Sequence, residues 1–210
     1  MSARDEIVAR IRAAQTGLPA APPASEPGYR RHWDTDRASL IARFIERLAD
    51  YHVSVLRARG DGEIGEVATR QLAARRIASL AIPADMQASW RPVCPAPLED
   101  LALSYHDLDR VQGAMTGSLL AVAETGTVVL DGGPGQGRRA LSLLPDYHLC
   151  VVREGSVVGI LPEAIAALAQ RALHGAAITF FSGPSATADI ELERVEGVHG
   201  PRTLDVILVA

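Results

Sequence analysis

The sequence predicts an α/β protein with an open parallel sheet that is covered by helices on both faces. Residues 53–57 and 77–82 read as strands, and the segment between them, 63–75, has a helical pattern. Residues 148–153 also read as a strand, and residues 204–209 are apolar enough to be a strand buried on both faces. The chain of 210 residues with 48% hydrophobic content is long enough to bury one continuous core.

The first predicted element is an amphipathic helix over residues 3–15. Ser2 and Asp5 have the spacing of a capping box, in which a side chain and a backbone N–H satisfy each other at the start of a helix. The apolar residues fall on one stripe: Ile7, Val8 and Ile11.

A proline-rich segment follows this helix. Residues 17–28 contain four prolines, which block both helix and sheet and stiffen the chain. We therefore divide the chain into residues 1–28, a helix with its linker, and residues 29–210, a single α/β domain.

A second helix is predicted over residues 35–51, with Thr35 and Asp36 as candidate caps. Its apolar stripe must face a sheet or another helix: Leu40, Ile41, Phe44, Ile45 and Leu48. The strand, helix and strand that follow form a β-α-β unit. In open α/β sheets, ligands bind beyond the carboxyl ends of the strands, so we expect the site there.

The remaining elements follow in order along the chain. Residues 83–106 are rich in proline and are expected to be irregular with short strands. Pro162 stands at the favoured first turn of a helix. The expected elements are strands at 118–123, 127–130, 148–153 and 157–160, a helix at 164–173, and buried central strands at 177–181 and 204–209.

Composition excludes several classes of function. The net charge of −4 is spread without a long single-sign block, which argues against nucleic acid as a partner. No signal peptide and no apolar run of the ~18 residues needed to cross a bilayer are seen, so we expect a cytoplasmic protein. The chain contains no lysine, which excludes Schiff-base chemistry and a phosphate-loop lysine.

The cysteines and histidines show no metal-binding spacing. Cys94 and Cys150 are far apart in sequence, and we expect both to be free thiols in or near the core. Five histidines are assigned structural or surface roles: His32, His52, His106, His148 and His174.

The segment 182–191 directly follows an apolar strand and suits an anionic ligand. Gly183 allows close approach of the backbone, while Ser185 and Thr187 offer hydroxyl groups and helix-cap geometry. The alternative is a strand-to-helix turn in which these hydroxyls satisfy only local backbone groups.

A second candidate is the turn at 197–202. His199 exchanges a proton near neutral pH, and Arg202 offers a planar cationic fork for a carboxylate. The alternative is a surface turn with the arginine in water.

A third candidate is the corner Glu124-Thr125-Gly126 between two strand-like stretches, where the carboxylate of Glu124 is a possible nucleophile or base. The alternative is a solvated glutamate at a strand end.

The glycine-rich run 131–139 lacks the spacing of a nucleotide motif. It reads either as a loop that lends Arg138 or Arg139 to an anion or as a plain connection.

Taken together, four motifs in order resemble the lactate utilization protein C (LutC/YkgG) family, whose domain is called the LUD domain. They are AETGT at 123–127, SLLP at 142–145, SGPSATADIE at 182–191 and GVHGPR at 197–202. They cover the second half of the chain. One departure is Ala186, where related sequences often carry a basic residue.

The resemblance implies a fold like that of the NagB/RpiA/CoA-transferase group, with an N-terminal helical extension. It also implies work with two other lactate-utilization subunits in oxidising L-lactate to pyruvate. Such an oxidation needs a two-electron acceptor. A four-iron cluster takes four thiolates and this chain has two cysteines, so we expect no cofactor here and iron–sulfur clusters on the partners.

Glu124 and Asp189 are the candidate catalytic residues. The candidate substrate-binding residues are Thr125, Gly126, Gly183, Pro184, Ser185, Thr187, His199, Gly200 and Arg202. Two other functions stay open: an enzyme resembling CoA-transferases or formyltetrahydrofolate cyclo-ligases with Glu124 as nucleophile, and a non-catalytic sensing or assembly protein.

Overall fold

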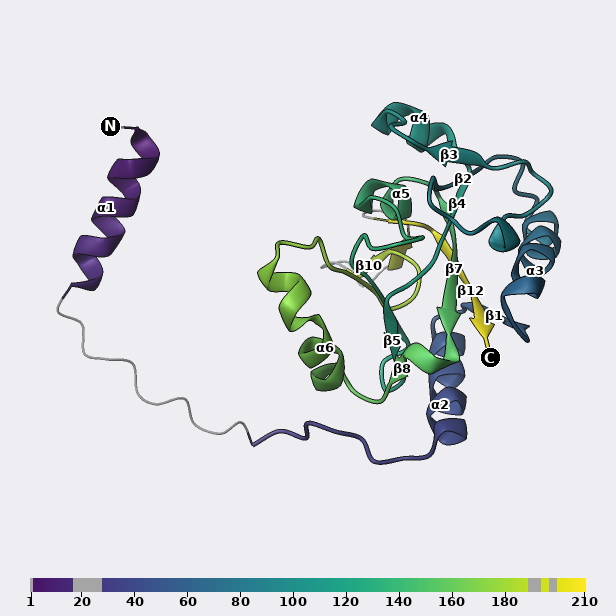
Figure 1. Cartoon of the computed structure of the whole chain (residues 1–210), viewed down its shortest axis with the longest axis horizontal. Coiled ribbons are helices and arrows are strands. Elements are labelled where there is room, and N and C mark those ends of the chain that lie inside the picture. The colour runs from purple at the N-terminus through teal and green to yellow at the C-terminus, as the bar shows by residue number, and fades with distance from the viewer. Residues whose placement is uncertain (1, 17–27, 189–193, 197–199) are drawn as a thin grey trace.

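The computed structural model describes residues 2–16, 28–188, 194–196 and 200–210, and for 186–188 and 194–196 it describes the backbone alone. Figure 1 shows the arrangement of its elements. The helices are α1 (Ala3–Gln15), α2 (Arg37–Asp50), α3 (Asp61–Ala74), α4 (Tyr105–Arg110), α5 (Arg139–Leu143) and α6 (Leu161–Leu173), with 3-10 turns at Ala88–Trp90 and Glu154–Ser156.

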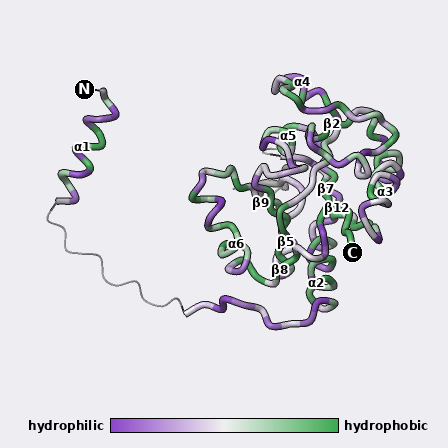
Figure 2. Tube along the Cα trace, viewed as in Figure 1, coloured by the Kyte–Doolittle hydropathy of each residue, from purple (hydrophilic) through white to green (hydrophobic). Residues whose placement is uncertain are grey.

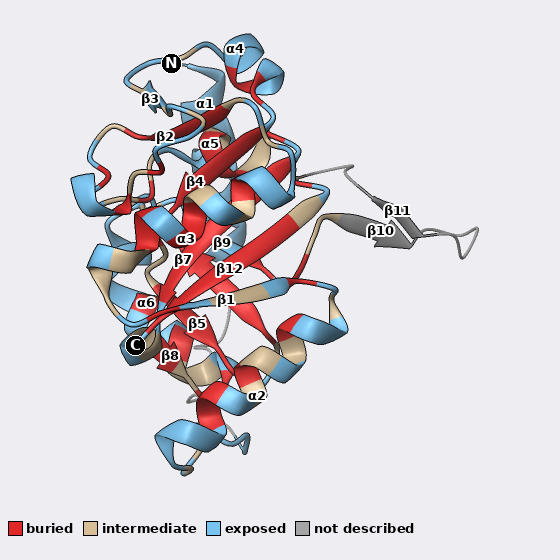
Figure 3. Cartoon of the chain, turned by 90° about the vertical axis from the view of Figure 1, so that its right-hand side faces the viewer, coloured by how far each residue is buried: buried red, intermediate tan, exposed pale blue. Residues whose placement is uncertain are grey.

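Six strands form the main sheet, in the order β1-β12-β7-β4-β2-β3, and every neighbouring pair is parallel. The central strands β7 and β12 are buried almost throughout (Figure 3). This confirms the predicted α/β class. The strands are β1 (Ser54–Ala58), β2 (Leu80–Pro83), β3 (Leu98–Asp100), β4 (Gly113–Thr116), β7 (Tyr147–Arg153) and β12 (Thr203–Val209).

A second sheet of four strands, in the order β8-β5-β6-β9, lies beside the main sheet and was not predicted as a separate sheet. Its strand β9 is at an edge, where Phe180 is 42% exposed, so the expectation of a buried central strand at 177–181 is wrong. The strands are β5 (Leu120–Val122), β6 (Thr127–Leu130), β8 (Val157–Val158) and β9 (Thr179–Phe181).

Helices and the second sheet cover the two faces of the main sheet. Ile64 and Leu72 of α3 pack with Leu149 on one face. On the other face, α2 and the second sheet share a core with β7 and β12. α6 covers the far side of the second sheet through Ala164 and Leu168. Figure 1 shows these layers in sequence, from α3 through the main sheet and β5 to α6.

α2 begins and packs as its sequence predicts. The Asp36 carboxylate accepts a hydrogen bond from the Ser39 backbone N at 2.9 Å, which caps the first turn. The buried side of the helix is made by Leu40, Ile41, Phe44 and Leu48. The carboxyl end of α2 leads into β1, and therefore lies where the strands of the main sheet begin.

Asp205 of β12 fixes α3 to the main sheet. Its carboxylate is fully buried and accepts hydrogen bonds from Arg75 Nε and Nη2 at 2.8 and 2.7 Å. Gln71 Nε2 and the Tyr147 hydroxyl donate to the same carboxylate at 2.6 and 3.0 Å. Asp205 in turn raises the pKa of Arg75, because it hydrogen-bonds the charged guanidinium. A buried carboxylate with four such contacts is stable only because its charge is paired.

The predicted N-terminal helix is confirmed, including the capping box of Ser2 and Asp5. None of its residues is buried, and hydrophilic and hydrophobic residues alternate along it in Figure 2.

Cys150 is buried, but Cys94 is exposed, so the expected packing of Cys94 is wrong; both thiols are free. Among the described residues, every helix is too short or too polar to serve as a transmembrane segment.

Candidate functional site at the amino edge of the main sheet

Three of the sequence motifs lie at the amino edge of the main sheet, by which we mean the edge where its parallel strands begin. The corner at 124–126 joins β5 to β6 and packs on the end of α2. Residues 182–185 follow β9, and residues 200–202 lead directly into β12. The expected placement beyond the carboxyl ends of the strands is therefore wrong. The reason is that β9 belongs to the second sheet, which carries these loops to the opposite edge.

A chain of hydroxyl groups joins the corner at 124–126 to the segment 182–185. Thr125 Oγ1 and Thr127 Oγ1 are 2.7 Å apart, and Thr127 Oγ1 is 2.7 Å from Ser182 Oγ. Thr127 and Ser182 are 55 positions apart in the sequence. The structure thus brings the Glu-Thr-Gly corner and the Ser-Gly-Pro-Ser segment together.

The glycines of both motifs are required by α2. Gly126 has φ +62°, and a Cβ there would lie 2.8 Å from Arg47 Cβ. Gly183 has φ +89°, and a Cβ there would lie 2.6 Å from Tyr51 Cβ. Only glycine fits such a left-handed backbone at so short a distance. Tyr51 occupies the space beside Gly183 that we expected a ligand to use.

The segments 182–185 and 200–202 lie side by side. The Ser185 backbone N donates to the Pro201 carbonyl oxygen at 2.8 Å. A Cβ at Gly200 would lie 3.3 Å from Ser185 Cβ. Pro184 and Ser185 are both half-buried. The segment does not continue into a helix: backbone residues Ala186–Ala188 form β10, which pairs antiparallel with β11 (Arg194–Glu196), so the helix-cap interpretation of this segment is wrong.

Glu124 is an exposed, ion-paired carboxylate. Its side chain is 43% exposed and accepts from Arg30 Nη2 at 2.7 Å. Its backbone N donates to the Gly159 carbonyl oxygen at 2.9 Å, which fixes the corner beside β8. The side chain is accessible to a ligand, but a ligand must compete with Arg30 for it.

Asp189 and His199 lie outside the described residues, and Thr187 is described by its backbone alone. The grouping of all the candidate site residues into one binding site therefore stays a prediction.

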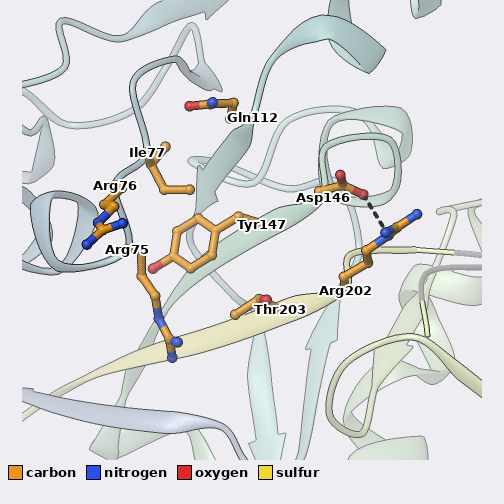
Figure 4. Close-up of a pocket in the computed structure, with 8 residues that line it drawn as sticks. All are labelled: Arg75, Arg76, Ile77, Gln112, Asp146, Tyr147, Arg202 and Thr203. Atoms are coloured by element: carbon orange, nitrogen blue, oxygen red, sulfur yellow. Dashed lines mark ion pairs between the residues drawn. The ribbon is translucent and has the colours of Figure 1, made fainter. Parts of the chain in front are cut away.

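Arg202 lines a cavity of about 320 Å³ at the same edge (Figure 4). Its Nε lies 3.4 Å from Asp146 Oδ1, and the side chain is 63% exposed. The cavity is lined by Arg75, Arg76, Ile77, Gln112, Asp146, Tyr147, Arg202 and Thr203. Sequence reasoning identified Arg202 alone among these. The available signal for Arg76 was that no glycine follows the predicted helix, although a glycine often stands at this position.

His148 lies inside the domain and was assigned a structural or surface role from sequence. Its ring contacts the Phe181 ring edge-on at a centroid distance of 5.3 Å, one residue before Ser182. Its Nε2 is 2.8 Å from Thr116 Oγ1, and its buried Nδ1 has no hydrogen-bond partner among the residues that the structure describes. Burial lowers the pKa of the imidazole to about 4, so the ring is neutral at pH 7. A single histidine within the apolar run of β7 was the available signal.

The glycine-rich loop at 131–139 is bound to the main body of the domain. Gly117 N donates to Gly135 O at 2.7 Å, and Gly135 N donates to Asp85 Oδ2 at 2.9 Å. Arg138 forms a bidentate ion pair with Asp100, with Nε and Nη2 at 2.7 and 2.9 Å from its oxygens. The guanidinium of Arg138 is therefore already committed. The described residues include no group of three or more His, Cys, Asp or Glu side chains positioned to bind a metal.

Comparison with known proteins gives three findings. The sequence model of the LUD domain matches residues 41–209. "Lactate utilization protein C" of Deinococcus radiodurans is 42% identical over 188 residues, covering 89% of this chain and 87% of that protein. The protein of the same name from Shouchella clausii is 33% identical over 128 residues, covering 60% of this chain and 50% of that protein.

A solved structure shares the fold. It is the crystal structure of a DUF162 family protein from Deinococcus radiodurans, with a TM-score of 0.73 and 36% sequence identity. The match covers 84% of this chain and 99% of that chain, so the similarity extends over most of the α/β domain.

Proposed function

The chain belongs to the LUD domain family, and we propose that it acts in lactate utilization as a subunit without an iron–sulfur cluster of its own. The observation that carries this proposal is the similarity to a protein named lactate utilization protein C over nearly the whole of both chains. The family match over residues 41–209 includes the core and all four motifs, and is not limited to one loop.

The chemistry of lactate oxidation supports a division of labour. Converting a 2-hydroxy acid to a 2-oxo acid releases two electrons, which a redox centre must accept. This chain has two cysteines, and burial raises the pKa of Cys150 to about 12, which holds it as a thiol. We therefore assign iron–sulfur clusters to two partner subunits, and to this chain the binding of substrate or of those partners.

The amino edge supports a binding role. Hydroxyl contacts join the corner at 124–126 to the segment 182–185, and a backbone hydrogen bond joins that segment to residues 200–202. The three loops therefore support one another. Glu124 and Arg202 present opposite charges there with side chains 43% and 63% exposed. Accessible charged groups on loops held by a rigid sheet are the usual components of a binding site.

The test is lactate-dependent reduction of an electron acceptor by the three purified subunits under anaerobic conditions. Omission of this chain is expected to reduce turnover to background, and its return to restore turnover. Glu124→Gln is expected to lower turnover, because it removes a charge at the amino edge. Glu66→Gln is the matched control: Glu66 of α3 is also an exposed glutamate paired with an arginine, at 2.9 Å from Arg70, and it lies away from the amino edge motifs, so turnover should not change.

Each outcome of this assay has a consequence. Unchanged turnover without the chain would contradict the proposal. Loss on omission with full activity of Glu124→Gln would leave a non-catalytic assembly or sensing role. Covalent labelling of Glu124 by an acyl-CoA, read by mass spectrometry, would instead favour an enzyme resembling CoA-transferases, with this carboxylate as nucleophile.

A further inference from the structure

We propose that the cavity at the amino edge binds a small organic dianion, with Arg76 and Arg202 as the partners of its two acidic groups. Figure 4 shows these two arginines on opposite sides of the Tyr147 ring. The cavity of about 320 Å³ lies at the lower end of the range of small-molecule pockets, which suits a compact organic acid. This inference does not depend on the role in lactate utilization.

The floor of the cavity is rigid. Tyr147 is 3% exposed and donates its hydroxyl to buried Asp205 at 3.0 Å. Arg75 is held by two hydrogen bonds to the same carboxylate, so its charge is already compensated. Ile77 and the Tyr147 ring supply apolar surface between the two remaining arginines. A fixed floor of this kind lowers the entropic cost of binding a ligand.

Arg76 is held in an unfavourable backbone conformation. It has φ +58° and follows α3, where Arg76 N donates to Ala73 O at 3.0 Å and Ile77 N donates to Leu72 O at 2.9 Å. This is the Schellman arrangement, whose left-handed residue is usually glycine. Among the described residues, Arg76 forms no ion pair. A strained arginine with an uncompensated charge beside a cavity is therefore available for an anion.

Arg202 is only weakly engaged. Within the described part of the chain it has one ion pair, to Asp146, whose N–O distance of 3.4 Å is longer than the ~2.7–2.9 Å of a charge-assisted hydrogen bond. Asp146 is itself 72% exposed. Gln112 accepts from Ala78 N at 2.6 Å through its Oε1, which leaves its amide NH2 as a further donor. A ligand carboxylate can displace Asp146 and gain a bidentate contact with the Arg202 guanidinium.

The test is isothermal titration of the purified full chain with succinate, L-lactate and inorganic phosphate at constant ionic strength. Succinate has two separated carboxylates, and is expected to bind more tightly than L-lactate or phosphate, each of which has one acidic group. Arg76→Gly and Arg202→Gln are each expected to weaken succinate binding by roughly tenfold, because each removes one charge-assisted contact. Asp146→Asn is expected to strengthen it, because it removes the competing carboxylate.

The same set of variants distinguishes loss of binding from loss of folding. Glycine is favoured at the conformation of Arg76, so Arg76→Gly should not lower the thermal midpoint. His52→Gly is the matched control: His52 has φ +60° at the same position after α2 and does not line the cavity, so succinate binding should be retained. The proposal is overturned by absence of saturable binding, by equal affinity for phosphate or lactate, or by binding that survives both arginine substitutions.

Discussion

His148 is neutral in the folded protein, because burial lowers the pKa of its imidazole to about 4. In the unfolded chain the same group titrates near 6.5. Between these values the unfolded state binds more protons, so the free energy of unfolding falls as the pH decreases from about 6.5 to about 4. The loss is absent above this window because the ring is then neutral in both states.

This predicts a specific pH dependence of stability. Between pH 7 and pH 5, His148 should cost the wild-type protein about 2 kcal/mol. The double variant Thr116→Val, His148→Leu removes the titrating ring together with its hydrogen-bond partner, and should lose that much less stability over the same interval. Urea unfolding at both pH values measures the difference. Parallel pH profiles for the two proteins would show that His148 is not titrated by unfolding.

At the scale of elements, α2 is the support of the candidate site. Gly126 and Gly183 come from motifs far apart in sequence, and both lie against its last turns. The sequence predicted α2 from its apolar stripe and its cap, but not its contacts with these glycines. Hydrophobic periodicity identifies which face of a helix is buried, whereas it does not identify the loop that rests on its polar side.

Gly183→Ala tests this contact. The left-handed backbone alone costs an alanine about 1 kcal/mol, and the clash with Tyr51 Cβ at 2.6 Å adds to that, for a total of about 2–4 kcal/mol. Gly175→Ala is the control, because Gly175 has φ +79° and open space around its Cβ position. Chemical denaturation should show the larger loss for Gly183→Ala. Equal losses would mean that Tyr51 does not restrict this position.

The strands show where sequence reasoning succeeds and where it stops. β7 and β12 were predicted because they are long and mostly apolar. β4 was missed, since Gly113-Ala114-Met115-Thr116 has small side chains and only one β-branched residue, although all four are buried. β9 was predicted but placed centrally, because apolar content does not encode the order of strands in a sheet.

At the scale of the whole molecule, segments that are distant in sequence meet at one edge of the main sheet. The four motifs indicated the family, and the family match over residues 41–209 is consistent with that reading. The choice of edge was wrong, because the second sheet, which redirects β9, has no signature in the sequence. The adjacency of residues 182–185 and 200–202 is therefore the structural claim from which the site follows.

A disulfide between Ser185→Cys and Gly200→Cys measures this adjacency directly. The Cβ atoms would be 3.3 Å apart, close to the spacing of natural disulfides, and Cys94→Ser removes the exposed native thiol. Under mild oxidation we expect an intramolecular disulfide, seen as loss of both reactive thiols without any cross-link between chains, whereas the Ser185→Cys single variant keeps its thiol. Two thiols that stay free and titratable in the folded double variant would contradict the convergence of these motifs at the amino edge.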